Sequence, residues 1–122
     1  MKLGVLVQRG LFRGLLGLSA LLALSGLAAT ADADGTPRGQ AIASSNACMG
    51  CHAVDRKLVG PSFQQIAGKY KGDAQAQARL ETKVRDGGSG VWGVLPMPSH
   101  RSMSGADIKT VVGWILAGSP SK

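Results

Sequence analysis

Cys48-Met49-Gly50-Cys51-His52 is the stretch of this chain from which its fold and chemistry are best interpreted. Two cysteines three residues apart, followed directly by a histidine, form the signature of covalent haem attachment. At this spacing both thiols can reach the two vinyl groups on one edge of a porphyrin and form thioethers. The adjacent imidazole then lies beneath the iron. The motif predicts one covalent haem on Cys48 and Cys51, with His52 as an axial ligand of the iron.

Three other interpretations of the cysteine pair compete with haem attachment. A thiol–disulfide redox centre is typical of a strand–helix setting in an α/β fold, and no strand pattern is found here. Half of a zinc site would need further ligands, but the sequence has two cysteines and two histidines in all. A chance occurrence is the third. Haem attachment is favoured over each of them.

The segment Pro96-Met97-Pro98 is the candidate for the opposite face of the iron. Two prolines stiffen the backbone, so they present the thioether in a fixed direction at low entropic cost. Thioether sulfur is a soft ligand, and His/Met ligation raises the reduction potential of a haem. A methionine in a loop is otherwise more often a filler of the hydrophobic core. Met97 is the preferred ligand, and Met49 and Met103 are weaker candidates.

The first 31 residues have the three parts of a secretory signal peptide. A basic start is followed by an uncharged apolar run over 14–29, and then by a small-residue cleavage pattern that ends at Ala31. An uncleaved membrane anchor is the alternative, because the run is nearly long enough to span a bilayer. We predict a cleaved signal peptide over 1–31 and one domain over 32–122, with no stable membrane insertion after cleavage.

Cleavage would change the net charge and the length of the protein. The expectations about nucleic-acid binding and about stability depend on these two quantities. All 7 acidic but only 11 of the 14 basic residues lie in 32–122, so the net charge falls from +7 to 11 − 7 = +4. No Lys/Arg-rich run is interleaved with aromatic residues, and no nucleic-acid binding is expected. A domain this small is marginally stable without a disulfide, metal or cofactor, so we expect folding and haem attachment to be coupled.

Four segments are expected to be helical: residues 36–47, 62–69, 74–85 and 104–117. Asp73 is the expected N-cap of the third helix, and Ser104 with Asp107 has the spacing of a capping box before the fourth. No segment alternates convincingly with a period of two. Residues 91–102 are expected to be irregular, because their prolines interrupt regular structure. The predicted fold class is all-α.

Several of these segments together resemble the small class I bacterial cytochromes c of the c-551 type. The resemblance extends from Gly39 to Ala117 and implies a compact four-helix fold wrapped around one covalent haem, with the N- and C-terminal helices crossing. It rests on five features: the sequence from Cys48 to Ala53, Val59-Gly60-Pro61, Gly90-Val91-Trp92-Gly93, Pro96-Met97-Pro98, and the last helix with Trp114.

The resemblance also implies roles for individual residues. Cys48 and Cys51 would carry the haem, His52 would be the proximal ligand and Met97 the distal ligand. These four residues are therefore the expected haem c site, with the iron held by the histidine and the methionine.

Two further residues receive roles from the resemblance, and two positions depart from it. The carbonyl of Pro61 would face the imidazole of His52, and Trp92 would donate to a haem propionate, with plain packing as the alternative for Trp92. Lys83 stands where some relatives carry an arginine near a propionate. His100 stands where members often carry an asparagine beside the ligating methionine. One hypothesis is that a protonated His100 donates to the ligand sulfur and makes the potential depend on pH.

The function implied by the resemblance is that of a periplasmic, monomeric single-electron carrier. Its partners would be a membrane respiratory donor and a terminal reductase, oxidase or peroxidase. Apolar residues near the haem edge, ringed by Lys57, Lys69 or Lys71, are the expected docking surface. An enzyme or gas sensor with an open iron site would require that Met97 not bind. A haem subunit of a larger complex is the third alternative.

Overall fold

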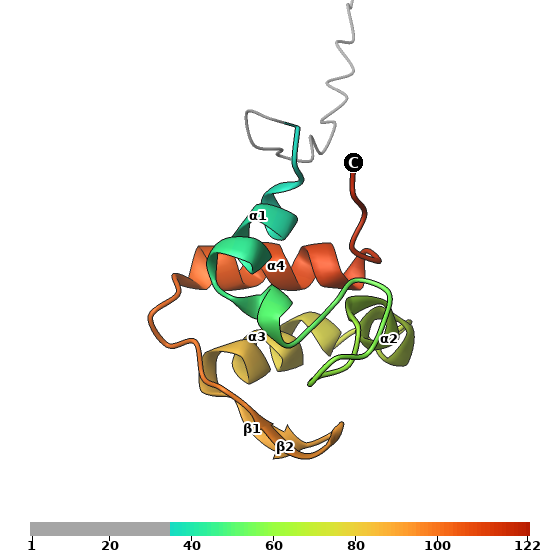
Figure 1. The fold of residues 1–122 in the computed structure, drawn as a ribbon, viewed down its shortest axis with the longest axis vertical. Coiled ribbons are helices and arrows are strands. Elements are labelled where there is room, and N and C mark those ends of the chain that lie inside the picture. The colour runs from blue at the N-terminus through green and yellow to red at the C-terminus, as the bar shows by residue number, and fades with distance from the viewer. Residues whose placement is uncertain (1–34) are drawn as a thin grey trace, which may run out of the picture.

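The computed structural model describes residues 35–122. The predicted signal peptide and the first residues of the predicted domain lie outside the described residues. Within the described part of the chain, none of the helices has the length and apolar character needed to cross a bilayer. After the last helix the chain runs away from the helix end to the C-terminus (Figure 1).

Residues 35–122 form four helices, one 3-10 turn and one small hairpin. The four helices of the predicted all-α fold are confirmed, and the hairpin is an addition to it. The elements are α1 (Arg38–Ser45), η1 (Cys48–Gly50), α2 (Phe63–Lys69), α3 (Ala76–Asp86), β1 (Gly88–Gly90), β2 (Gly93–Met97) and α4 (Gly105–Leu116). Helix α4 is central, because it contacts α1, α2 and α3. Figure 1 shows α1 lying across α4, with the hairpin at the periphery of the helices.

The hydrophobic core is built on α4. Its apolar residues recur at helical spacing, so one face of the helix is buried, and Ile108 and Val112 have no exposed surface. Helix α1 approaches this face closely at Gly39, where a Cβ atom would collide with Trp114. The indole of Trp114 packs edge-on against Phe63, with 5.4 Å between the ring centroids. Three helices therefore meet at one tryptophan.

A serine caps the start of two helices, α2 and α4. The hydroxyl of Ser62 accepts from the backbone N–H of Gln65, whose side chain accepts from the N–H of Ser62, which completes a capping box. Ser104 accepts from the N–H of Asp107 at 3.0 Å, which is one half of the predicted capping box. The carboxylate of Asp107 instead accepts from Arg38 at 3.3 Å.

The starts of two helices differ from the sequence-based prediction. The N-cap of α3 is Gln75, and Asp73 lies two residues earlier, where its carboxylate accepts from the N–H of Gln75 at 2.8 Å. Asp73 therefore forms a turn ahead of the helix, as aspartate side chains commonly do, and the prediction that it caps the helix was wrong. Helix α1 is shorter than predicted, because Pro37 is its N-cap and Ala47 adopts a left-handed φ of 59° after its end.

The hairpin contradicts the prediction that residues 91–102 are irregular. Strand β1 pairs antiparallel with β2, with Gly88 opposite Met97, Gly90 opposite Gly93 and a bulge between them. Pro96 is tolerated in β2 because both strands of a two-stranded sheet are edge strands. The sequence lacks a period of two because the hairpin buries neither face, and every residue of both strands except Met97 is exposed.

Candidate haem site

The attachment motif forms the turn that leaves α1. Within η1 the N–H groups of Cys51 and His52 both donate to the carbonyl of Cys48, at 3.2 and 3.0 Å. Cys48 begins this 3-10 turn and Cys51 is its C-cap, so the backbone brings the two cysteines close together. Both cysteines are free and half-buried. The turn therefore keeps the two cysteines and His52 within one short segment, with Cys51 and His52 at the wall of the cavity described below.

The environment of Cys48 is unsuited to thiol redox chemistry. Burial raises the pKa of its thiol, because removal from water disfavours the thiolate. Reactive redox cysteines have a lowered pKa instead, usually at a helix N-terminus or next to a positive charge. The fold also lacks, within residues 35–122, the strand–helix unit that such centres use. The thiol–disulfide alternative is therefore disfavoured.

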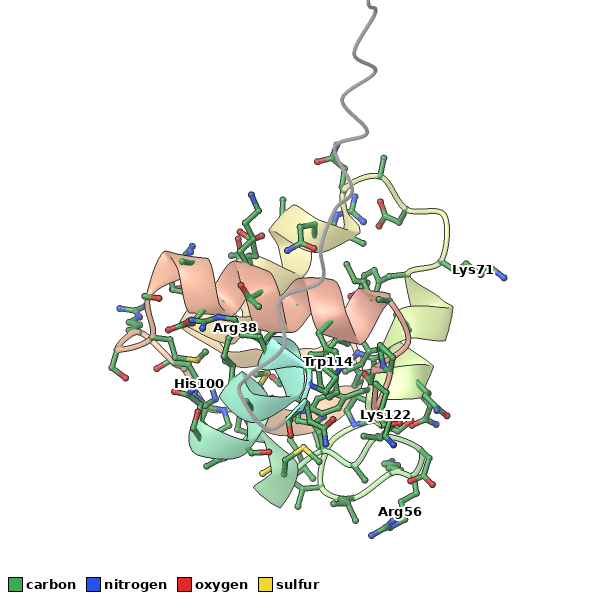
Figure 2. The ribbon with its side chains drawn as sticks, turned by 90° about the horizontal axis from the view of Figure 1, so that it is seen from above. Arg38, Arg56, Lys71, His100, Trp114 and Lys122 are labelled. Atoms are coloured by element: carbon green, nitrogen blue, oxygen red, sulfur yellow. The ribbon has the colours of Figure 1, made fainter. Side chains whose placement is uncertain are left out.

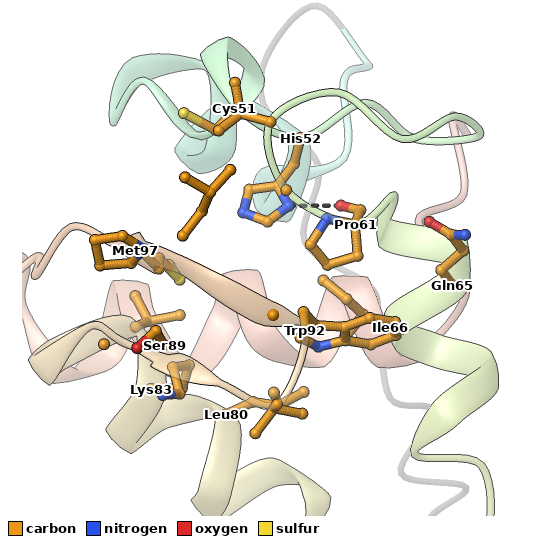
Figure 3. A pocket seen from close by; sticks show the side chains of 18 of the residues that line it. Cys51, His52, Pro61, Gln65, Ile66, Leu80, Lys83, Ser89, Trp92 and Met97 are labelled. Carbon is orange, nitrogen blue, oxygen red and sulfur yellow. Dashed lines mark hydrogen bonds between the residues drawn. The ribbon is translucent and has the colours of Figure 1, made fainter.

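His52 is held in one orientation by the loop that follows it. Its Nδ1 lies 2.6 Å from the carbonyl oxygen of Pro61, the contact expected from the resemblance (Figure 3). The imidazole stacks on Phe63, with ring centroids 5.4 Å apart and an angle of 18° between the planes. With Nδ1–H donating to this carbonyl, Nε2 keeps its lone pair and is able to bind a metal.

Gly60 has a role in this site that inspection of the sequence did not identify. A Cβ atom at this position would lie 2.5 Å from Cε1 and 2.9 Å from Nδ1 of His52. The residue must therefore be glycine for the imidazole to reach the carbonyl of Pro61. In the sequence, Gly60 belongs to the Val59-Gly60-Pro61 feature on which the resemblance rests, but closeness to a histidine eight residues earlier has no local signature.

A cavity of about 410 Å³ brings most of the predicted site residues together. Its walls include Cys51, His52, Pro61, Trp92 and Met97, and the remaining lining is mainly apolar. Figure 3 shows the imidazole of His52 and the thioether of Met97 on opposite sides of this cavity.

Cys48 and the other methionines of the described chain lie elsewhere. Cys48 packs against the edge of the hydrophobic core, with its Sγ 3.8 Å from the carbonyl of Asn46. Met103 also packs against the core, and Met49 is exposed. Of the methionines that the structure describes, Met97 is therefore the one that lines the cavity.

The backbone of Met97 rests on the end of α3. Gly87, the C-cap of that helix, has a φ of 71° and a ψ of −150°, a conformation restricted almost entirely to glycine. A Cβ atom there would collide with the carbonyl oxygen of Met97 and lie 2.9 Å from the carbonyl carbon of Pro98. Beyond this point the N–H of His100 donates to the carbonyl of Val84 at 3.0 Å. The backbone from Met97 to His100 thus lies against the end of α3.

The remaining candidates lie around the mouth of the cavity. Trp92 is 43% exposed, and Nζ of Lys69 lies 5.3 Å from the centroid of its ring. Lys83 lines the cavity and donates from Nζ to the carbonyl of Gly87 at 3.2 Å. No hydrogen bond joins the ring of His100 to Met97 among residues 35–122, so the hypothesis about its protonation has no direct contact to support it.

The donor set and the lining of the cavity fit a haem. Imidazole nitrogen and thioether sulfur are the donors that hold haem iron in electron-transfer proteins, and they face one another here. Val94 is 90% exposed and Leu95 68% exposed, yet both belong to the cavity wall. Apolar side chains in such positions suit a large flat apolar group.

Comparison with known proteins agrees with this geometry. Residues 37–119 match the family model described as cytochrome c, and the chain belongs to that family. It accordingly carries one haem c attached through Cys48 and Cys51, and it is an electron carrier and not an enzyme.

Within the family, the chain is similar to bacterial cytochromes c-551 and c-552. It is 48% identical over 75 residues to cytochrome c-551 of Allochromatium vinosum, covering 62% of this chain and 80% of that protein. It is 43% identical over 103 residues to cytochrome c-552 of Nitrosomonas europaea, covering 84% and 91%. The crystal structure of the latter superposes with a TM-score of 0.63 at 42% identity, covering 65% of this chain and 98% of that one.

Proposed function

We propose that this cytochrome c shuttles single electrons in the periplasm with its iron held between Nε2 of His52 and the sulfur of Met97. One observation carries the proposal: the two side chains face one another across the cavity, and Nδ1 of His52 lies 2.6 Å from the carbonyl of Pro61. When bound, the haem supplies an iron that accepts and releases one electron. The chain's residues supply the ligands and the surroundings.

Each proposed ligand is supported by contacts that limit its movement. The carbonyl of Pro61 and the ring of Phe63 orient His52, and the packing of Gly87 fixes the backbone of Met97. With His52 and Met97 both bound to it, the iron would change little in its surroundings between oxidation states. Ligation by thioether sulfur favours the reduced iron and raises the potential. Both properties suit transfer of an electron between partners and leave no open position for a substrate.

Trp92 has the exposure required for its proposed role. Its indole lines the cavity and remains 43% exposed, so its N–H is available to a haem propionate at the mouth.

The proposed compartment and partners follow from the predicted signal peptide and the charge. Cleavage after Ala31 would leave a domain of net charge +4 that acts as a monomer in the periplasm. We propose a membrane respiratory complex as donor and a terminal reductase, oxidase or peroxidase as acceptor. A positive rim that includes Lys57 and Lys71 would steer acidic partners and would change the encounter rate more than the affinity.

Visible spectroscopy of the haem-loaded protein tests the ligand assignment. The oxidised protein is expected to show the weak far-red band of Met–iron ligation, and the reduced protein is expected not to bind carbon monoxide. Met97→Ala should abolish the band and admit carbon monoxide, whereas the matched variant Met103→Leu should retain wild-type spectra. A wild-type protein that lacks the band and binds carbon monoxide would contradict the proposal.

A further inference from the structure

One side-chain contact joins the tip of the hairpin to the helices. Trp92 lies in the turn between β1 and β2, and Lys69 is the last residue of α2. Nζ of Lys69 lies 5.3 Å from the centroid of the indole, within the range of a cation–π interaction. This contact links two segments that are 23 residues apart, since 92 − 69 = 23.

The rest of the hairpin has little to hold it. Strand β1 has no buried residue, and in β2 only Met97 is partly buried. Its base is tied to α3 through Gly87 and through the donation of Lys83 to the carbonyl of Gly87. Among residues 35–122, no hydrogen bond joins the strands or their turn to α2. A segment with few buried contacts and one fixed end opens easily.

We infer that Lys69 is a positioning residue, which holds the β1–β2 hairpin closed over the haem cavity through its cation–π contact with Trp92. The hairpin carries Trp92 at its tip and Met97 at its base, so release of the tip loosens one wall of the cavity. The expected effect of Lys69 on ligand exchange at the iron rests on the proposed ligation by Met97. The expected effect of Lys69 on the opening of the hairpin does not depend on that ligation.

The chain offers a matched control for charge. Lys71 is exposed and lies two residues after Lys69, and Figure 2 shows its side chain projecting outward from the loop that follows α2. Lys71→Gln removes the same charge from the same region without touching the indole. Lys69→Arg keeps a cation over the ring, because arginine makes the same type of contact.

Two measurements on the haem-loaded protein test the inference. The first is amide hydrogen exchange over residues 88–97, with the amides of α4 as an internal reference. The second is the rate at which neutral imidazole, added above its own pKa, displaces the native ligand of the oxidised iron. Lys69→Gln is expected to accelerate both by about two- to fivefold, the factor that corresponds to an exposed cation–π contact. Lys69→Arg and Lys71→Gln should remain within error of the wild type.

The outcomes separate this inference from the proposed function. Unchanged hairpin exchange in Lys69→Gln, equal acceleration in Lys71→Gln, or an acceleration shared by α4 would each overturn it. A wild-type protein without the Met–iron band would refute the ligand assignment, while hairpin exchange would still decide the role of Lys69.

Discussion

The crossing of α1 and α4 and the β1–β2 hairpin are stabilised in opposite ways. Helix α1 packs closely on α4 where Gly39 contacts Trp114. The face of α4 that points into the core is almost wholly buried. The hairpin is exposed along both strands and is fixed only at its base and its tip. His52 therefore lies on the side of the cavity that the packed helices form, and Met97 lies on the side that the exposed hairpin forms. The difference implies that the helical core carries most of the stability, whereas a few contacts position the proposed distal ligand.

Removing the attachment chemistry should have the largest effect, because it affects both regions. The variant Cys48→Ser/Cys51→Ser is expected to lose covalent haem and most of its helical structure, since so small a core is marginal without its cofactor. Circular dichroism of the exported protein measures this, with Met49→Leu as a control that retains haem. Native-like helical content in the double variant would contradict the coupling of folding and attachment.

A methyl group at the helix crossing tests the stable region alone. Gly39→Ala forces a Cβ atom into the side chain of Trp114 and should lower the free energy of unfolding by about 3 kcal/mol. Gly113→Ala is the matched control within α4. Its Cβ atom would meet only the side chain of Gln77 at 3.9 Å, so a gain of about 0.5–1 kcal/mol is expected from the helical backbone. Urea unfolding measures both, and equal effects would refute the close approach.

A methyl group at the base of the hairpin tests the other region. Gly87→Ala combines an unfavourable backbone conformation with a collision against the backbone around Met97, at a cost of about 2 kcal/mol. The far-red band of the oxidised protein should weaken as Met97 is displaced. Gly68→Ala, an open position in α2, should leave the band unchanged. A full-strength band in Gly87→Ala would show that Met97 does not depend on this contact.

The exposed ion pair between the crossing helices should contribute least. Arg38 and Asp107 are 3.3 Å apart, and their side chains are 50% and 37% exposed. Solvent screening limits such pairs, so Arg38→Gln should lower the free energy of unfolding by about 0.5 kcal/mol or less. Urea unfolding at low and high salt measures the loss. A loss as large as that of Gly39→Ala would mean that charge, not packing, holds the crossing.

The two regions also differ in how well sequence predicts them. The helices were predictable because their apolar residues recur with the period of a helix and because Ser62 and Ser104 act as caps. The hairpin was not, because strands that bury neither face have no alternating pattern, and Pro96 suggested irregular structure. Proline interrupts central strands and helices, but it is tolerated in edge strands such as β2.

The residues of the site also differ in how well the sequence predicts them. The attachment motif identified Cys48, Cys51 and His52, and two flanking prolines singled out Met97. The resemblance also predicted the contact between the Pro61 carbonyl and His52. Three other contacts were missed because they have no local signature in the sequence: Gly60 against His52, Gly87 against Met97, and Lys69 over Trp92. Motifs indicate which residues bind the haem, whereas tertiary packing determines how these residues are positioned.

Nuclear magnetic resonance of the reduced protein with isotopically labelled methionine methyl groups tests the central claim most directly. A methyl group bound beside the iron lies over the porphyrin and is shifted strongly upfield by its ring current. The account predicts one such resonance, lost in Met97→Ala and retained in Met103→Leu. No upfield methyl resonance, or one that survives Met97→Ala, would contradict ligation of the iron by His52 and Met97.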